Sequence, residues 1–280
     1  MTTPVPKPAP KPAPKPAGKP PAKTVATVRK LGISKGVHSG PQRIIVYGPG
    51  GVGKSELASL LQDVGISPLF IDLEDGTRFL DVSRVDPIPE TFEELRESIR
   101  MAKDVEGIDA IVIDSLTKAE ELAMNFVVRT VKHEKGKPIN SIEDFGFGKG
   151  YTHIYEAMLL LLQELDAAAR AGKHIIGIAH ECTANVPNPA GDDWIRYEPR
   201  LQSPKSGQNS TRHRIKEWCD HMLFVGFDTH VSEDGKAKGS GSRTIHPIEM
   251  PTHWAKSRLL DEPIVYERES AEVWQEIFKS

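Results

Sequence analysis

Eight residues, Gly48 to Ser55, constrain the fold more than any other part of the chain. Their sequence, GPGGVGKS, matches the phosphate-binding pattern G-x-x-x-x-G-K-[ST] in full. A β-branched run over 43–47 precedes them, and a helical pattern over 54–62 follows. Glycines permit a tight turn whose amides point inward at phosphate oxygens. The segment therefore predicts a strand, a phosphate loop and a helix, with a chance Gly-rich turn as the alternative.

Each residue of this loop has an expected role in binding a nucleotide. Lys54 is expected to neutralise the β- and γ-phosphates and to act in catalysis, and the Ser55 hydroxyl is expected to ligate Mg²⁺. The residues predicted to cradle the phosphates are Gly48, Pro49, Gly50, Gly51, Val52, Gly53, Lys54 and Ser55.

The second half of the nucleotide site is expected to be an acidic residue at the end of another buried strand. Four apolar residues, 110–113, precede Asp114, which would hold magnesium through a bound water. The alternative is a helix cap, because Asp114 and Ser115 also precede a helical pattern; both roles are compatible.

Apolar runs and helical patterns alternate along the chain, which predicts an α/β fold. We expect a mostly parallel sheet with helices on both faces, followed by a late β-hairpin. Helices are predicted over 91–105, with Thr91 and Glu94 as a capping box, and around 154–165. Further strands are predicted over 68–72, 108–113, 173–179, 221–227, 242–248 and 263–266.

Composition separates residues 1–23 from the rest. Pro, Lys and Ala alternate there, with five lysines and no acid, which predicts a disordered, extended tail. We interpret it as a solubilising tether, with weak contact to nucleic acid or an acidic partner as the alternative. Residues 24–280 are predicted to form a single domain. Without the five tail lysines, 31 basic residues face 39 acidic ones, a net charge of −8.

No apolar run approaches the roughly 20 residues that cross a bilayer, and no signal segment is evident at the start of the chain. Two cysteines cannot form a disulfide framework. We therefore expect a cytoplasmic protein with no membrane partner.

The run Phe70-Ile71-Asp72-Leu73-Glu74 resembles the strand end that carries the catalytic glutamate in RecA-like recombinases, and Asp114-Ser115 resembles their second nucleotide motif. The resemblance implies a RecA-like P-loop NTPase core that binds ATP and Mg²⁺. It implies Glu74 as the general base and Asp72 as its support. The alternative is a solvated loop entrance.

His180 ends the strand predicted over 173–179. In RecA-like proteins a polar residue here, usually glutamine, senses the γ-phosphate and leads into a DNA-binding loop. Histidine could act likewise, or be structural. A rival chemistry is zinc binding by His180, Cys182, Cys219 and His221, although neither pair has the usual spacing.

Two long polar stretches, 132–150 and 183–216, are predicted to be loops that interleave basic and aromatic residues. DNA-binding loops follow the same strands in RecA-like proteins, although acids dilute both stretches, so ordinary charged surface is the alternative. The candidate DNA-binding residues are Lys135, Lys137, Lys149, Arg196, Arg200, Lys205, Arg212 and Arg214. Lys256 and Arg258 resemble the Lys-x-Arg element that reaches a neighbouring subunit's γ-phosphate, with a surface turn as the alternative.

The layout resembles the small phage-encoded nucleotide-binding proteins of the RecA superfamily, which include single-strand annealing recombinases. It implies an ATPase that acts on single-stranded DNA in phage recombination, annealing or replication within the host cytoplasm. It also implies a homo-oligomer, as a filament or ring, with a single-strand-binding protein as a further partner. The alternatives are a nucleotide-gated annealing module with little turnover, and a small-molecule P-loop kinase.

Overall fold

The computed structural model describes residues 32–36, 40–204, 208–231 and 237–279. The chain divides into two units, Met1–His38 and Ser39–Ser280. In the first unit the described residues, 32–36, are exposed and form neither helix nor strand. The tail predicted over 1–23 lies outside the described residues, so that prediction and the boundary at residue 24 remain predictions.

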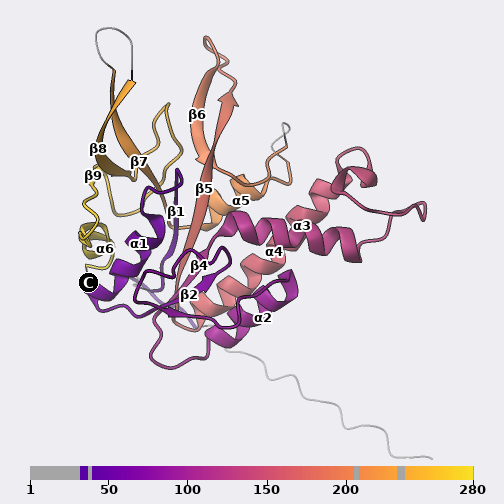
Figure 1. Ribbon diagram of the computed structural model, residues 1–280, viewed down its shortest axis with the longest axis horizontal. Coiled ribbons are helices and arrows are strands. Elements are labelled where there is room, and N and C mark those ends of the chain that lie inside the picture. Colours follow the sequence, from indigo (N-terminus) through magenta and orange to yellow (C-terminus); the bar gives the residue numbers. More distant parts are fainter. Residues whose placement is uncertain (1–31, 37–39, 205–207, 232–236, 280) are drawn as a thin grey trace, which may run out of the picture. The chain divides into compact units, whose positions relative to one another are not determined.

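The second unit is built on one sheet in which the strand of the phosphate loop is central (Figure 1). The strand order is β3-β2-β4-β5-β1-β7-β8-β9, and β6 pairs with β5 outside this path. Neighbours from β3 to β7 run parallel, whereas β8 and β9 are antiparallel. The strands are β1 (Arg43–Gly48), β2 (Pro68–Asp72), β3 (Ser83–Arg84), β4 (Ala110–Asp114), β5 (His174–Val186), β6 (Trp194–Pro199), β7 (His221–Val231), β8 (Ala237–His246) and β9 (Ile264–Val265).

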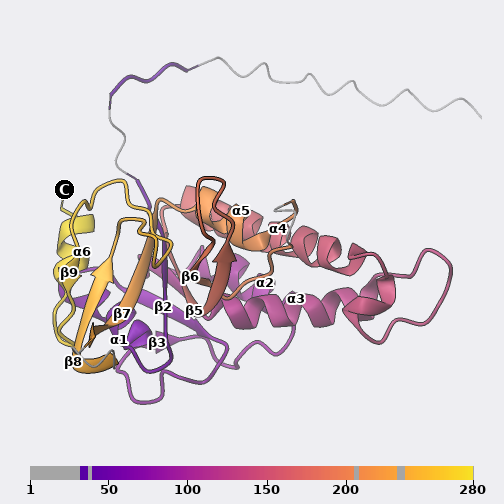
Figure 2. The same cartoon turned by 90° about the horizontal axis from the view of Figure 1, so that it is seen from above.

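Helices cover both faces of this sheet, and each face has its own core (Figure 2). Successive residues of β1 alternate between them: Ile45 and Tyr47 pack in one cluster, Ile44 and Val46 in the other. The first cluster involves α2 (Phe92–Ala102), α3 (Leu116–Thr130), η2 (Ile142–Phe145), α4 (Lys149–Arg170) and α5 (Thr211–Trp218). The second involves α1 (Lys54–Ser59), η1 (Leu60–Val64) and α6 (Glu272–Ile277). The predicted α/β class, with a mostly parallel sheet and helices on both faces, is confirmed.

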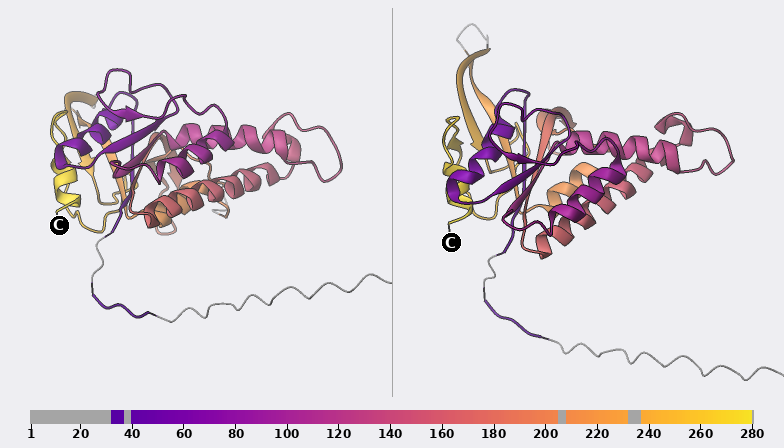
Figure 3. Two further views of the ribbon diagram at one scale, coloured as in Figure 1. Left: turned by 90° about the horizontal axis from the view of Figure 1, so that it is seen from below. Right: turned by 60° about the horizontal axis from the view of Figure 1, so that its bottom comes forward.

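Local signals placed several boundaries correctly. The Thr91 hydroxyl accepts from the Glu94 amide at 3.2 Å, and the Glu94 carboxylate accepts from the Thr91 amide at 3.1 Å. This is the predicted capping box. The late hairpin is also present: β8 pairs with β9, and with β7 on its other side. Figure 3 shows α3 and α4 side by side on one face.

The prediction of a long loop is wrong for 183–216, whereas most of 132–150 is loop as predicted, with 132–141 in neither helix nor strand. The second stretch contains the end of β5, all of β6 and most of α5, and only 205–207 within it lie outside the described residues. Glu181–Val186 pair antiparallel with Trp194–Pro199, so β5 continues beyond the sheet as a two-stranded hairpin. The first stretch contains η2 and the start of α4. Strands of a hairpin with one exposed face alternate polar with apolar residues, and so many polar residues resemble the composition of a loop.

In the described part of the chain, none of the helices has the length and apolar character to span a bilayer.

Candidate functional site

The loop between β1 and α1 needs glycine at two positions. Gly48 has φ +157°, and a Cβ there would lie 2.0 Å from the Val225 carbonyl oxygen on β7. Gly53 has φ +95° and is enclosed by the side chains of Glu56 and Tyr266, each about 3.2 Å from where its Cβ would lie. A larger residue would displace backbone at Gly48 and strain the turn at Gly53.

Lys54 begins α1 and is buried, with its ammonium folded back onto the loop. Its Nζ donates to the carbonyl oxygens of Gly48 and Pro49, both at 2.8 Å. Burial lowers the pKa of Lys54, although the charges of Glu181 and Asp114 oppose this shift. The ammonium is therefore held at the loop mouth by groups that a phosphate could replace.

Asp114 and Ser55 face each other at the ends of β4 and the phosphate loop. The Ser55 hydroxyl donates to Asp114 Oδ2 at 2.5 Å. Burial, together with the charges of Asp72 and Glu74, raises the pKa of Asp114 to about 6, against the opposing effect of the Ser55 hydrogen bond. A hydroxyl and a buried carboxylate fit the hard oxygen ligands that Mg²⁺ prefers.

Asp72 organises the turn that presents Glu74. It lies opposite Asp114 in the β2–β4 register. Its carboxylate accepts from the Thr77 amide at 2.8 Å and the Thr77 hydroxyl at 2.6 Å, and also from the amides of Glu74 and Gly76. Burial raises the pKa of Asp72, but these hydrogen bonds lower it below its ordinary value. Asp72 therefore supports the turn from within.

Glu74 is held between β4 and β5 by two partners. Its carboxylate accepts from the Ser115 hydroxyl and lies 3.0 Å from His180 Nε2. Burial raises the pKa of Glu74, but the hydrogen bonds from Ser115 and His180 and the charges of His180 and Arg200 lower it overall. The carboxylate is therefore charged and fixed in position near neutral pH.

Five of the side chains predicted to act in catalysis or metal binding thus lie together at the ends of neighbouring strands. Gly48 is the register partner of His180 across β1 and β5. Parallel strands bring their carboxyl ends to one edge, where ligands of such sheets gather. The residues that gather at this edge are Lys54, Ser55, Glu74, Asp114 and His180.

Four residues at this edge were missed or given another role. Ser115 caps α3 by accepting from the Lys118 amide at 3.1 Å, as one prediction had it, yet also contacts Glu74. Thr117 Oγ1 accepts from the His180 amide at 3.1 Å. The charge of Glu181 acts on Lys54, and that of Arg200 on both Lys54 and Glu74. Ser115 and Arg200 had been singled out in the sequence for other roles, whereas Thr117 and Glu181 had not been singled out.

Four of the eight candidate DNA-binding residues form ion pairs with acidic residues of the chain. The buried Glu198 carboxylate binds Arg196 at 2.7 Å and Arg212 at 2.6 Å. Lys149 pairs with Glu134 at 2.7 Å, and Arg214 lies 3.9 Å from Glu217. Within the described residues, no ion pair engages Lys135, Lys137 or Arg200. Lys205 lies outside them.

Lys256 and Arg258 lie near the first residues of β1 and β7. The phosphate loop lies at the other end of the sheet, after the last residue of β1. Lys256 Nζ donates to the carbonyl oxygens of Lys216 at 3.0 Å and Cys219 at 2.8 Å, at the end of α5. Arg258 lies 3.1 Å from Asp220, which also pairs with Arg43 at the start of β1. A role toward a neighbouring subunit stays a prediction.

The zinc alternative fails on geometry. His180 pairs in register with Gly48, and His221 with Ile44, so they lie four residues, or ~13 Å, apart along β1. Burial raises the pKa of the Cys219 thiol to about 12, which disfavours a thiolate ligand. Among the residues that the structure describes, no three His, Cys, Asp or Glu side chains gather as a metal site.

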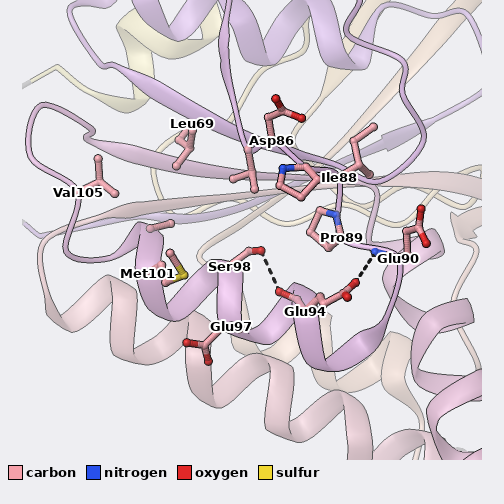
Figure 4. A pocket seen from close by; sticks show the side chains of 13 residues that line it. Leu69, Asp86, Ile88, Pro89, Glu90, Glu94, Glu97, Ser98, Met101 and Val105 are labelled. Atoms are coloured by element: carbon pink, nitrogen blue, oxygen red, sulfur yellow. Dashed lines mark hydrogen bonds between the residues drawn. The ribbon is translucent and has the colours of Figure 1, made fainter.

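A groove of about 600 Å³ lies apart from these residues, between the β2–β3 edge and α2 (Figure 4). Met101, Ile88 and Val105 give it an apolar lining, and Glu94 and Glu97 lie beside it. It contains none of the residues predicted for phosphate or metal binding.

Comparison with known proteins agrees with this geometry. The AAA domain family (AAA_24) matches residues 40–259. No curated protein matches the chain. Among solved structures, the chain is similar to the KaiC-like protein PH0186 from the hyperthermophilic archaeon Pyrococcus horikoshii OT3, at 12% identity and a TM-score of 0.43. That similarity covers 82% of this chain and 88% of the other. Because the family match spans most of the chain, the protein belongs to the AAA domain family and has a P-loop ATPase core.

Proposed function

We propose that this protein is a Mg²⁺-dependent ATPase that acts on single-stranded DNA in phage recombination, annealing or replication. The observation that carries the proposal is the meeting of Lys54, Ser55, Asp114, Glu74 and His180 at one edge of the sheet. One cation, one hydroxyl and two carboxylates on separate strands are the parts that phosphoryl transfer to water requires.

The chain's own groups have distinct tasks in this proposal. Lys54 exchanges its two carbonyl partners for phosphate oxygens and neutralises their charge. Ser55 and Asp114 would hold Mg²⁺, which supplies further charge neutralisation at the β- and γ-phosphates when bound. Glu74 accepts the proton of the attacking water. His180, 3.0 Å from Glu74, donates to the γ-phosphate and reports its presence.

The proposed binding of single-stranded DNA is supported by the hairpin that extends from this edge of the sheet. The β5–β6 hairpin continues directly from His180, and Figure 1 shows it projecting from the sheet, as the β7–β8 hairpin does. Its side chains Ile195 and Tyr197 are 69% and 44% exposed. An exposed aromatic can stack on bases, and Arg200, which no ion pair engages among the described residues, can contact phosphate. We further propose a homo-oligomer, as a filament or ring, and a single-strand-binding protein as partner.

Substitution of Glu74 by glutamine tests the proposal. The Glu74→Gln protein should bind ATP normally but lose about 10²-fold or more of its turnover, because the amide cannot accept the water's proton. The matched control is Asp75→Asn, since Asp75 is the next acid, exposed and paired with Arg78. Steady-state ATP hydrolysis is measured with and without a single-stranded oligonucleotide, and the complex is sized in parallel. Undiminished turnover in Glu74→Gln contradicts the assignment, and turnover indifferent to oligonucleotide contradicts the role of DNA.

A nucleotide-gated annealing module is the second candidate. His180 and Ser115 both occupy the Glu74 carboxylate, so ATP could act by rearranging this contact rather than through hydrolysis. Annealing that survives in Glu74→Gln favours the module. The kinase alternative is disfavoured, because Asp72 is saturated by Thr77 and neighbouring amides and has no free oxygen for an acceptor hydroxyl. Phosphoryl transfer to a nucleoside would support it.

A further inference from the structure

A pocket of about 540 Å³ lies beside the catalytic edge, between α3, α4 and the segment that follows β6. Its lining includes Glu120 of α3, Tyr151 of α4, Arg200, Gln202 and Ser203. Apart from Arg200, none of these residues has a role in the proposed hydrolysis. The pocket is polar on one wall and aromatic on another.

Glu120 is the unusual group in this pocket. Its side chain is buried, with 7% of the residue exposed. Oε2 accepts from the Gln202 amide at 2.8 Å, whereas Oε1 accepts no hydrogen bond from the residues that the structure describes. The Thr211 hydroxyl, also buried and without a hydrogen-bond partner among the described residues, lies close enough to Glu120 to act on its pKa. Burial raises the pKa of Glu120 to about 7, against the opposing effects of Gln202, Thr211 and the charge of Arg212. A buried acceptor without a donor is costly unless a ligand supplies the donor.

The other walls of the pocket offer a π-face and a free cation. The Tyr151 residue is 38% exposed, and its hydroxyl donates to Glu143 at 3.0 Å, which holds the ring. Among the described residues, no ion pair engages Arg200. Arg212, by contrast, is committed to Glu198 and to the Leu201 carbonyl oxygen, so it shapes the wall.

We propose that this pocket receives one unstacked base of the DNA strand, and that it selects a base with an exocyclic amino group, such as cytosine. The amino group donates to Glu120 Oε1, the base stacks on Tyr151, and Arg200 contacts an adjacent phosphate. Thymine presents a carbonyl oxygen where cytosine presents this amino group, so it meets the carboxylate unfavourably. The inference rests on the proposed function in DNA binding and adds base selection to it.

The position of the pocket links base binding to the catalytic edge. Thr117, one helical turn before Glu120, accepts from the His180 amide. The Arg200 amide donates to the His180 carbonyl oxygen at 2.8 Å, and Arg200 is two residues from Gln202. A base that engages Glu120 therefore lies close to Thr117 and Arg200, two residues that contact the His180 backbone. We expect a strand that fills the pocket to stimulate turnover more than one that does not.

The test compares labelled 20-nucleotide dC and dT strands at pH 8, using fluorescence anisotropy with the full-length protein and ATP. The parent should bind dC about 10-fold more tightly than dT, as one good contact to a base edge contributes. In Glu120→Gln, the amide oxygen can keep the Gln202 contact while its amino group faces the pocket and donates to thymine. That variant should lose or reverse the dC preference. The control is Glu106→Gln, an exposed glutamate beyond α2, which should keep it.

Each outcome decides the proposal. Equal, salt-dependent affinity of the parent for the two strands overturns base selection and leaves the proposed function intact. No affinity for either strand overturns both. An unchanged dC to dT ratio in folded Glu120→Gln overturns the role of Glu120. If that variant does not fold, Tyr151→Leu decides through stacking: weaker binding to dC supports the pocket, and unchanged binding overturns it.

Discussion

At the scale of single residues, the site depends on a carboxylate that does not touch the nucleotide in our proposal. Asp72 accepts four hydrogen bonds from the turn that follows it, two of them from Thr77. Two residues later, that turn brings Glu74 against Ser115 and His180. The sequence resemblance already gave Glu74 the role of base and Asp72 that of its support, but the donors that fold back onto Asp72 could be identified only in the structure.

The Asp72→Asn substitution tests this division. An amide turns one acceptor into a donor that faces Thr77 donors, so the free energy of unfolding should fall by about 1–3 kcal/mol. Turnover should fall as well, because Glu74 loses its support. Urea denaturation and ATP hydrolysis are measured together, and Asp75→Asn in the same turn is the control. A variant as stable as the parent would show that the turn holds itself without the carboxylate.

At the scale of elements, the sequence was sufficient to predict those structures that depend on contacts between residues close together in the chain. The strand, loop and helix around Lys54 and the capping box at Thr91 depend on contacts within a few residues. The β5–β6 hairpin could not be predicted in this way. Its strands expose one face, and the buried Glu198 that pairs with Arg196 on the same strand also pairs with Arg212 of α5, which is distant in the sequence. Those arginines were therefore assigned to DNA when the fold uses them internally.

Lys256 provides a test at this scale, because its ammonium caps α5. The Lys256→Met protein should lose about 1–2 kcal/mol of unfolding free energy, since the carbonyl oxygens of Lys216 and Cys219 lose a charged donor. Arg258→Met is the control: Arg258 is 62% exposed in its side chain, and its partner Asp220 keeps Arg43. Its stability should stay within about 0.5 kcal/mol of the parent. Thermal and urea unfolding measure both.

The opposite pattern would identify a finger that acts on a neighbouring subunit. Unchanged stability in Lys256→Met, together with lost turnover in the assembled protein, would show that the capping contact is incidental. It would restore the role that the sequence resemblance implied for Lys256 and Arg258.

At the scale of the whole molecule, charge is distributed unevenly between the tail and the rest. Residues 24–280 carry 31 basic and 39 acidic residues, whereas the first 23 carry five lysines and no acid. Ion pairs also engage four of the basic residues first assigned to DNA. An acidic body repels a polyanion, so the five tail lysines are further candidates for contact with DNA phosphates.

Removal of residues 2–23 should therefore reduce the salt dependence of single-strand binding. It should have little effect on ATP hydrolysis. Each phosphate neutralised contributes about −0.7 to the slope of log affinity against log salt, so five lysines contribute at most about −3.5. The matched control replaces those five lysines by glutamine at constant length, which separates charge from tether length. Both variants should lose the same part of the slope and keep DNA-independent turnover. An unchanged slope in the two variants would place every phosphate contact on residues 24–280 and leave the tail as a tether.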